Sequence, residues 1–277
     1  MTGAVLPARE PRARFRDLLA AEWLRLWSLR STFWALPAAM VAVVAFNVGT
    51  AWDHYRYWHA YGPAGRADFV AHGMALRDAF TGNAATVLVL CAAAMGAVAV
   101  TGEYAAGSIR TTFAAVPARG AVMSAKVLVV AAVQTLFGAA VAGLSFWLTQ
   151  AVLAVRGAGV PLAHPGALRV VVASALLAPV CAVTGMALAA VVRRGSLSVV
   201  AAVVLLLFLP MALGERRRLT AVLAHTTPLR AWERLVAAGP AEAVPYPWST
   251  GGAWLVYGMW PAAAAVVTAL VVRRRDQ

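Results

Sequence analysis

The segment Thr101–Gly120 reads TGEYAAGSIRTTFAAVPARG and separates two long apolar segments. No charged residue occurs in the 24 residues from Ala79 to Gly102 or in the 29 residues from Val127 to Val155. A helix of about 20 apolar residues crosses a bilayer, so both flanking segments are long enough to span a membrane. The charged segment is therefore expected to form a turn on one face of that membrane.

Within this turn the sequence predicts a short helix held outside the lipid. Gly102 is expected to end the preceding helix, and Glu103 to begin the new one, where a carboxylate complements the helix dipole. Ile109 and Phe113 are four residues apart and would form an apolar knob on one face. Pro117 would stop the helix. A soluble partner could receive this knob; the alternative is an ordinary interfacial loop whose charges anchor two helix ends.

The composition of the 277 residues extends this interpretation to the whole chain. Hydrophobic residues make up 62% and charged residues 13%, whereas soluble proteins have about 25% charged residues. We therefore expect an all-α integral membrane protein. The charge-free stretches predict six transmembrane helices, at about residues 32–52, 80–101, 127–154, 169–192, 196–214 and 252–272.

The distribution of basic residues predicts the orientation. With six spans, both termini lie on the same side, and that side carries 14 of the 24 arginines and lysines. Basic residues favour the cytoplasmic side, so both termini are expected to be cytoplasmic, although Arg216, Arg217 and Arg218 fall on the external side. The same bias explains the net charge of +13 without a nucleic-acid partner. Abundant arginine and alanine with a single lysine indicate a bacterial chain, and hence the bacterial plasma membrane.

The N-terminal 30 residues predict an amphipathic helix lying in the headgroup region of the bilayer. Phe15, Trp23 and Trp27 recur at helical spacing among basic residues such as Arg25, and tryptophan and arginine suit the membrane interface. The alternative is a plain basic anchor. The domain organisation is then an interfacial helix (1–30), a six-helix domain (31–272) and a basic tail (273–277).

Three motifs of the chain resemble one family of membrane proteins. Residues 102–112 read GEYAAGSIRTT and are followed by AAVPAR at 114–119; residues 21–32 read AEWLRLWSLRST, and the chain ends in RRRDQ. In order and spacing these motifs are similar to the permease subunits of ATP-binding-cassette (ABC) type-2 exporters, particularly the actinobacterial kind.

The resemblance implies a transport subunit that is not itself an enzyme. Such a subunit works with cytoplasmic ABC ATPases and forms a homodimer, or a heterodimer with a second permease. ATP and magnesium would be bound by the ATPase, so no cofactor is expected in this chain. The residues expected to contact the ATPase are Gly102, Glu103, Tyr104, Gly107, Ser108, Ile109, Arg110 and Phe113, with Arg193 and Arg194 as a smaller second contact.

The absence of certain residue types indicates which energy sources could drive transport by this chain. The six charge-free stretches on which the predicted spans rest contain no Asp, Glu, Lys, Arg or His, Arg169 standing at the very start of the fourth span, and proton-coupled carriers usually need such groups inside the bilayer. A Walker A loop needs Gly-Lys-Ser/Thr, but the only lysine, Lys126, follows Ala125. Energy for uphill transport would therefore come from another subunit. Two alternatives stay open, a non-transporting sensor or immunity subunit and a membrane-embedded enzyme; the substrate is equally open among lipids, peptides and hydrophobic drugs.

A few residues inside the spans have less specific roles. Small residues are expected to permit close helix packing, and two cysteines to act as apolar filler. A metal site is not expected, because His54 and His59 do not share a helical face. Short helices are expected between the fifth and sixth spans. Polar residues that would either line a path or, by preference, bridge helices are Asn47, Gln134, Thr135, Ser174 and Thr184; the small residues are Gly96, Gly138, Gly143 and Gly185, and the cysteines Cys91 and Cys181.

Overall fold

The structure, a computed structural model, describes residues 14–28, 30–105, 107, 111–112, 115–116, 118–214, 217–238 and 246–275. The elements within these ranges are helices. In chain order they are α1 (Phe15–Ser28), α2 (Arg30–Tyr57), the 3-10 helix η1 (Trp58–Ala60), α3 (Pro63–Ala71), α4 (Met74–Ala79), α5 (Gly82–Ala105), α7 (Arg119–Ala154), α8 (Ala167–Val192), α9 (Gly195–Val203), the π-helix η2 (Val204–Phe208), α10 (Leu209–Ala212), α11 (Arg218–His225), α12 (Pro228–Val236) and α13 (Thr250–Arg275).

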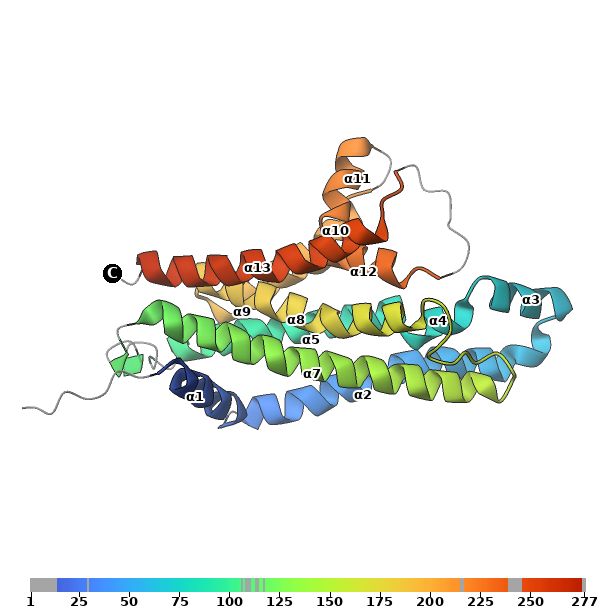
Figure 1. The fold of residues 1–277 in the computed structure, drawn as a ribbon, viewed down its shortest axis with the longest axis horizontal. Helices are drawn as coiled ribbons and strands as arrows, with labels where there is room; N and C mark the ends of the chain where they lie inside the picture. Colours follow the sequence, from blue (N-terminus) through green and yellow to red (C-terminus); the bar gives the residue numbers. More distant parts are fainter. Residues whose placement is uncertain are drawn as a thin grey trace, which may run out of the picture.

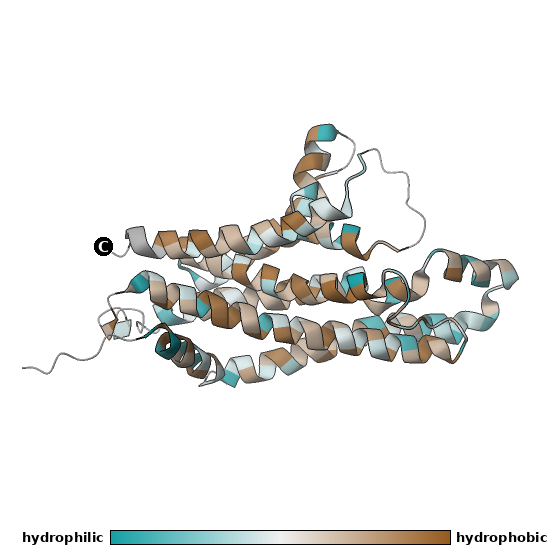
Figure 2. Cartoon of the chain, viewed as in Figure 1, coloured by the Kyte–Doolittle hydropathy of each residue, from teal (hydrophilic) through white to brown (hydrophobic). Residues whose placement is uncertain are grey.

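Six helical segments of the described chain are long and apolar enough to cross a membrane, as the sequence predicted. They are α2 with η1, α4 with α5, α7, α8, α9 to α10, and α13. Figure 1 shows the long helices side by side along the longest axis of the molecule, with α1 and the C-terminal end of α13 at the same end of the bundle. Hydrophilic residues gather on α1 and towards the ends of the bundle (Figure 2). This is the architecture of a multi-pass helical membrane protein.

Several helices extend beyond the charge-free stretches. The 36 residues of α7 give a helix about 54 Å long at 1.5 Å per residue, whereas the hydrocarbon core of a bilayer is about 30 Å thick. Its first turns, which carry Arg119 and Lys126, therefore project past the apolar segment. The last turn of α5 likewise carries Glu103. Charged groups are absent from the middle of these two helices but present in their end turns.

The end of α5 corrects one prediction from the sequence. Gly102 does not end the helix, which continues to Ala105, so Glu103 lies in the last turn of α5 and begins no new helix. The left-handed glycine that follows the helix is Gly107, with φ +67°, and its N–H donates to the carbonyl of Tyr104. A glycine inside a helix costs only about 1 kcal/mol relative to alanine. Gly102 by itself therefore does not end α5.

The centre of the bundle is α8, which packs against α5, α7 and α13. Glycines permit the close approach, as predicted. A Cβ on Gly96 of α5 would lie 1.9 Å from the carbonyl oxygen of Ala182, and one on Gly185 of α8 would lie 2.2 Å from that of Ala93. On α7, a Cβ on Gly138 would lie 2.0 Å from an α8 carbonyl oxygen. The backbones of α5, α7 and α8 therefore touch where only glycine fits.

Gly143 does not have the same role. A Cβ there would meet nothing within 4 Å, so the prediction of close packing is wrong at this position. Both cysteines are free thiols, with Cys181 buried and Cys91 partly buried, and both pack in the apolar core.

At the end of the bundle opposite α1, polar contacts join α2 to its neighbours. Asn47, fully buried in α2, donates to Ser145 Oγ of α7 at 3.0 Å and accepts from the backbone N–H of Thr81 at 2.8 Å. His54 Nδ1 lies 2.6 Å from Asp78 Oδ2 of α4. No group of three or more His, Cys, Asp or Glu in the described chain is arranged to hold a metal.

The segment before the last span forms two short helices, α11 and α12. The apolar side of α12 packs against α8 and α13. Its Trp232 is buried, and the indole Nε1 donates to Ser174 Oγ of α8 at 3.1 Å. α12 is therefore part of the helix bundle and contributes to its core.

Candidate functional site

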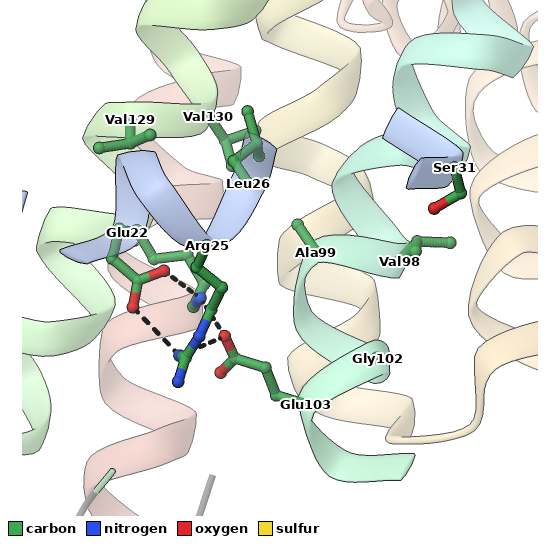
Figure 3. Close-up of a pocket in the computed structure, with 11 residues that line it drawn as sticks. Glu22, Arg25, Leu26, Ser31, Val98, Ala99, Gly102, Glu103, Val129 and Val130 are labelled. Carbon is green, nitrogen blue, oxygen red and sulfur yellow. Dashed lines mark hydrogen bonds and ion pairs between the residues drawn. The ribbon is translucent and has the colours of Figure 1, made fainter. Parts of the chain in front are cut away.

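A cluster of four charged residues, three of them buried, joins three helices at the α1 end of the bundle. Glu22 and Arg25 come from α1, Glu103 from the last turn of α5, and Lys126 from the second turn of α7. We call this set the ionic cluster; Figure 3 shows Glu22 and Arg25 directed towards Glu103. Lys126 donates to both Glu22 Oε2 and Glu103 Oε1. Arg25 Nη1 lies 2.7 Å from Glu103 Oε1 and 3.5 Å from Glu22 Oε1.

The sequence of α1 places its two residues of the ionic cluster, Glu22 and Arg25, on the face that packs against the bundle. Leu18, Glu22 and Arg25 are spaced i, i+4 and i+7, so they share one helical face. Leu18 packs with Val122 and Ala125 of α7, and this apolar contact sets the next turn of α1 beside Lys126. The cluster is therefore built on the packed contact between α1 and α7.

Because three members of the ionic cluster are buried, each of these charges needs an opposite charge beside it. Glu22, Glu103 and Lys126 are only 7%, 8% and 3% exposed, and an unpaired charge at such burial is costly. The C-terminal end of a helix also disfavours a carboxylate, so Glu103 in the last turn of α5 depends on its cations. Two carboxylates and two cations leave the cluster with no net charge.

The cluster also reaches the charged segment between α5 and α7. Arg25 Nη2 donates to Thr112 Oγ1 at 3.1 Å, and a guanidinium can serve several acceptors at once through its planar fork. Arg25 therefore connects α1, the end of α5 and residue 112 at a single point. The sequence had suggested only a headgroup anchor for this arginine; the structure places it in the cluster, with about a third of its side chain exposed.

The aromatic residues of α1 lie away from the cluster. Phe15, Trp23 and Trp27 are each at least 40% exposed, and the two indoles pack edge to face at 5.7 Å. This exposed aromatic side is the one predicted to lie at the membrane interface.

The structure brings part of the predicted contact set together. Glu103 belongs to the ionic cluster and Gly102 lines the cavity beside it. Tyr104 and Arg193 meet, with the guanidinium carbon 5.1 Å from the ring centre; Arg193 has the left-handed φ of +58° after α8, and Arg194 is exposed at the start of α9. Ser108, Ile109, Arg110 and Phe113 lie outside the described residues.

The five polar residues predicted inside the spans have three different surroundings. Asn47 and Ser174 bridge helices through the hydrogen bonds given above. Thr135 and Thr184 donate to carbonyls of their own helices, both at 2.7 Å. Gln134 differs from these four because it lines a cavity.

That cavity has two adjoining parts between α1, α2, α5 and α7. The first, of about 200 Å³, lies against the ionic cluster (Figure 3). The second, of about 220 Å³, continues along α7 to Gln134. Leu26, Ser31, Val98, Ala99 and Val130 line both parts. We call the pair the two-part cavity; its wall is mostly aliphatic.

Sequence reasoning missed three members of this site, namely Glu22, Thr112 and Lys126. One signal was present for Lys126, because it is the only lysine in the chain. Glu22 could have been noticed as an acidic residue on the face of α1 that also carries Leu18. No local signal pairs them, since they are 104 residues apart in sequence.

A scan against models of known protein families and a search of curated protein sequences both find no match to this chain. The class of the protein therefore rests on the fold and the site, which define a multi-pass helical membrane protein with a buried ionic cluster at one end of its bundle.

Proposed function

We propose that this chain is the permease subunit of an ATP-driven exporter of the ABC type, located in the plasma membrane of a bacterium. In this proposal it forms the substrate path together with a second permease, identical or different, and cytoplasmic ATPase subunits supply the energy. The segment between α5 and α7 receives the ATPase.

The observation that carries the proposal is the position of the ionic cluster. Its members flank the 106–118 segment on both sides, with Glu103 just before it and Lys126 just after it, while Arg25 contacts Thr112. A force applied to this segment by a soluble partner would therefore act on α1, α5 and α7 together. An ordinary loop between two helices has no need of a junction of four charges, three of them buried.

The orientation predicted from the sequence agrees with this function. α1, the end of α5, the turn between α8 and α9, and the end of α13 lie at one end of the bundle (Figure 1). The sequence places the larger share of arginine and lysine there, which favours the cytoplasm. The second predicted contact, at Arg193, touches Tyr104 of the first, so one partner could cover both.

The direct test is site-specific photo-crosslinking in cells of the native host. A photoreactive amino acid replaces Ser108 in one variant and His164, in the turn at the other end of the bundle, in the control. We expect Ser108 to capture a protein with a Walker A sequence and His164 not to do so. Capture of that ATPase from His164, or of none from Ser108, would contradict the proposal.

A quantitative test compares two substitutions in the same segment. A buried apolar anchor contributes about 2 kcal/mol or more to an interface, whereas a charge at its rim contributes little. Phe113→Ala should therefore weaken binding of the captured ATPase more than Arg110→Ala, whose effect should lie in association rate and salt dependence. Stimulation of ATP hydrolysis by a transported substrate would further distinguish an exporter from a non-transporting sensor.

A further inference from the structure

Two side chains of α2 contact the junction between α4 and α5. Asn47 Oδ1 accepts hydrogen bonds from the backbone N–H and the hydroxyl of Thr81 at 2.8 and 3.1 Å. Seven residues further along α2, His54 Nδ1 lies 2.6 Å from Asp78 Oδ2. Residues i and i+7 share a helical face, so one face of α2 contacts both sides of the junction. The contact at Asn47 contains no titratable group, whereas the contact at His54 contains two.

The chain is not helical at this junction. Phe80, which follows α4, has the extended backbone angles φ −153° and ψ 102°, and α5 begins at Gly82. α4 and α5 are therefore separate helices joined at an interruption. A change in the contact at Asp78 can shift α4 without bending a continuous helix, while Asn47 still holds Thr81.

Asp78 depends on His54 for its countercharge. Asp78 is only 2% exposed, and in the described part of the chain its carboxylate has no hydrogen-bond or ion-pair partner other than His54. A buried carboxylate without a cation is costly, and a carboxylate beside an imidazole favours the protonated ring. The side chain of His54 is 19% exposed, so its proton can exchange with the solvent.

The surroundings of this pair consist mainly of aromatic rings. The ring centres of Phe69 on α3 and of Tyr61 lie 5.1 and 6.4 Å from that of His54. Asp53 adds a second negative charge, which also favours the protonated imidazole. Within the described residues, no other charged side chain of the neighbouring elements is ion-paired with His54 or Asp78. These side chains are Arg56 on α2, His59 on η1, Arg66 and Asp68 on α3, Arg77 on α4 and Arg156 just after α7.

We infer that the His54–Asp78 pair is a pH-sensitive contact, which holds α4 against α2 when His54 is protonated and loosens when His54 is neutral. The stabilisation is present below about pH 6.5, where a free histidine is itself protonated, and is lost as the pH rises through the titration of the folded pair. In the predicted orientation this end of the bundle faces the outside of the cell, so the contact would respond to external acidity. The inference goes beyond the proposed export function and does not depend on it.

The first test measures thermal unfolding of the full chain in phospholipid nanodiscs at about pH 6 and about pH 8.5. We expect the melting temperature of the unmodified protein to exceed that of His54→Gln by about 3 °C more at the lower pH than at the higher. Asp78→Asn should show the same pH dependence as His54→Gln, because it removes the buried charge. His59→Gln, at an exposed histidine in η1, is the matched control and should follow the unmodified protein.

A second test reports the position of α4 directly. Ala75 of α4 is buried in an apolar cluster with Ala51 of α2, so a cysteine at residue 75 detects separation of the two helices. With Cys91 and Cys181 replaced by alanine, Ala75→Cys is labelled by a soluble maleimide, alone and combined with Asp78→Asn. The ratio of the two rates at each pH removes the pH dependence of the thiol chemistry. We expect the rate without Asp78→Asn, divided by the rate with it, to rise about threefold or more from the lower to the higher pH.

A constant difference in melting temperature between the unmodified protein and His54→Gln at the two pH values would overturn the inference. So would a labelling ratio that does not change with pH, or a loss of the pH dependence in His59→Gln as well. If His54→Gln fails to fold, the melting profile and the labelling ratio of Asp78→Asn decide the outcome. Its amide keeps an acceptor for His54 without the charge.

Discussion

Lys126 on α7 is ion-paired with Glu103 on α5, although the charged turn separates the two residues in sequence. The same ammonium group contacts Glu22 on α1, and all three side chains are buried. The single lysine of the chain thus joins three helices at the end where the sequence predicts contact with an ATPase.

Removing this lysine should destabilise the protein strongly. Lys126→Met leaves two buried carboxylates with only Arg25 between them, and breaking a buried pair on one side costs about 3–5 kcal/mol. Thermal unfolding in detergent measures the loss. Arg218→Met, at an exposed position, is the control and should change stability by less than about 0.5 kcal/mol.

A double substitution separates charge pairing from packing in the same cluster. Glu22→Gln combined with Lys126→Met removes one charge of each sign, so it should be more stable than Lys126→Met alone. A double-mutant cycle measures this coupling. Strictly additive losses would show that the residues contribute by packing alone.

Arg25→Lys should test the connection to residue 112. A lysine keeps the charge but cannot reproduce the fork that serves Glu22, Glu103 and Thr112 together. In vesicles containing the permease and its ATPase, we expect ATP hydrolysis to continue while substrate exported per ATP falls. Arg218→Lys is the matched control, and an unchanged ratio in Arg25→Lys would argue against transmission through this arginine.

Glycine substitutions should distinguish helix packing from helix propensity. Gly96→Ala places a methyl group against the Ala182 carbonyl, and overpacking of this kind costs about 1–3 kcal/mol or more. Gly49→Ala, inside α2 with nothing within 4 Å, should be neutral or stabilising by up to about 1 kcal/mol. Melting temperatures of the two variants check the contrast, and equal effects would contradict the close α5–α8 contact.

Thiol labelling should establish the orientation. With Cys91 and Cys181 replaced by alanine, Arg194→Cys should react with an impermeant reagent only after the membrane is opened. His164→Cys should react in intact cells. His164 is a better position than the nearby Gly159, where a Cβ would lie 2.7 Å from the carbonyl oxygen of Gln150. Labelling in the opposite pattern would reverse the topology and remove the basis for an ATPase at residue 108.

The number of spans and the presence of α1 were determined by the sequence alone. A span needs only enough consecutive apolar residues to cross the hydrocarbon core, and an amphipathic helix needs only its periodic pattern. Both are local properties of the chain. Gly96, Gly138 and Gly185 were likewise recognised by type, because small residues let membrane helices approach.

The tertiary structure decided where charges meet and which small residues matter. Sequence could not place Glu103 in the last turn of α5, because Gly102 and Gly107 look alike until backbone conformation is known. It could not separate Gly143 from Gly138, since only the path of α8 distinguishes them. The contact between Arg25 and Glu103 joins residues 78 apart in the chain; it exists because α1 packs against α7, and no local pattern encodes that approach.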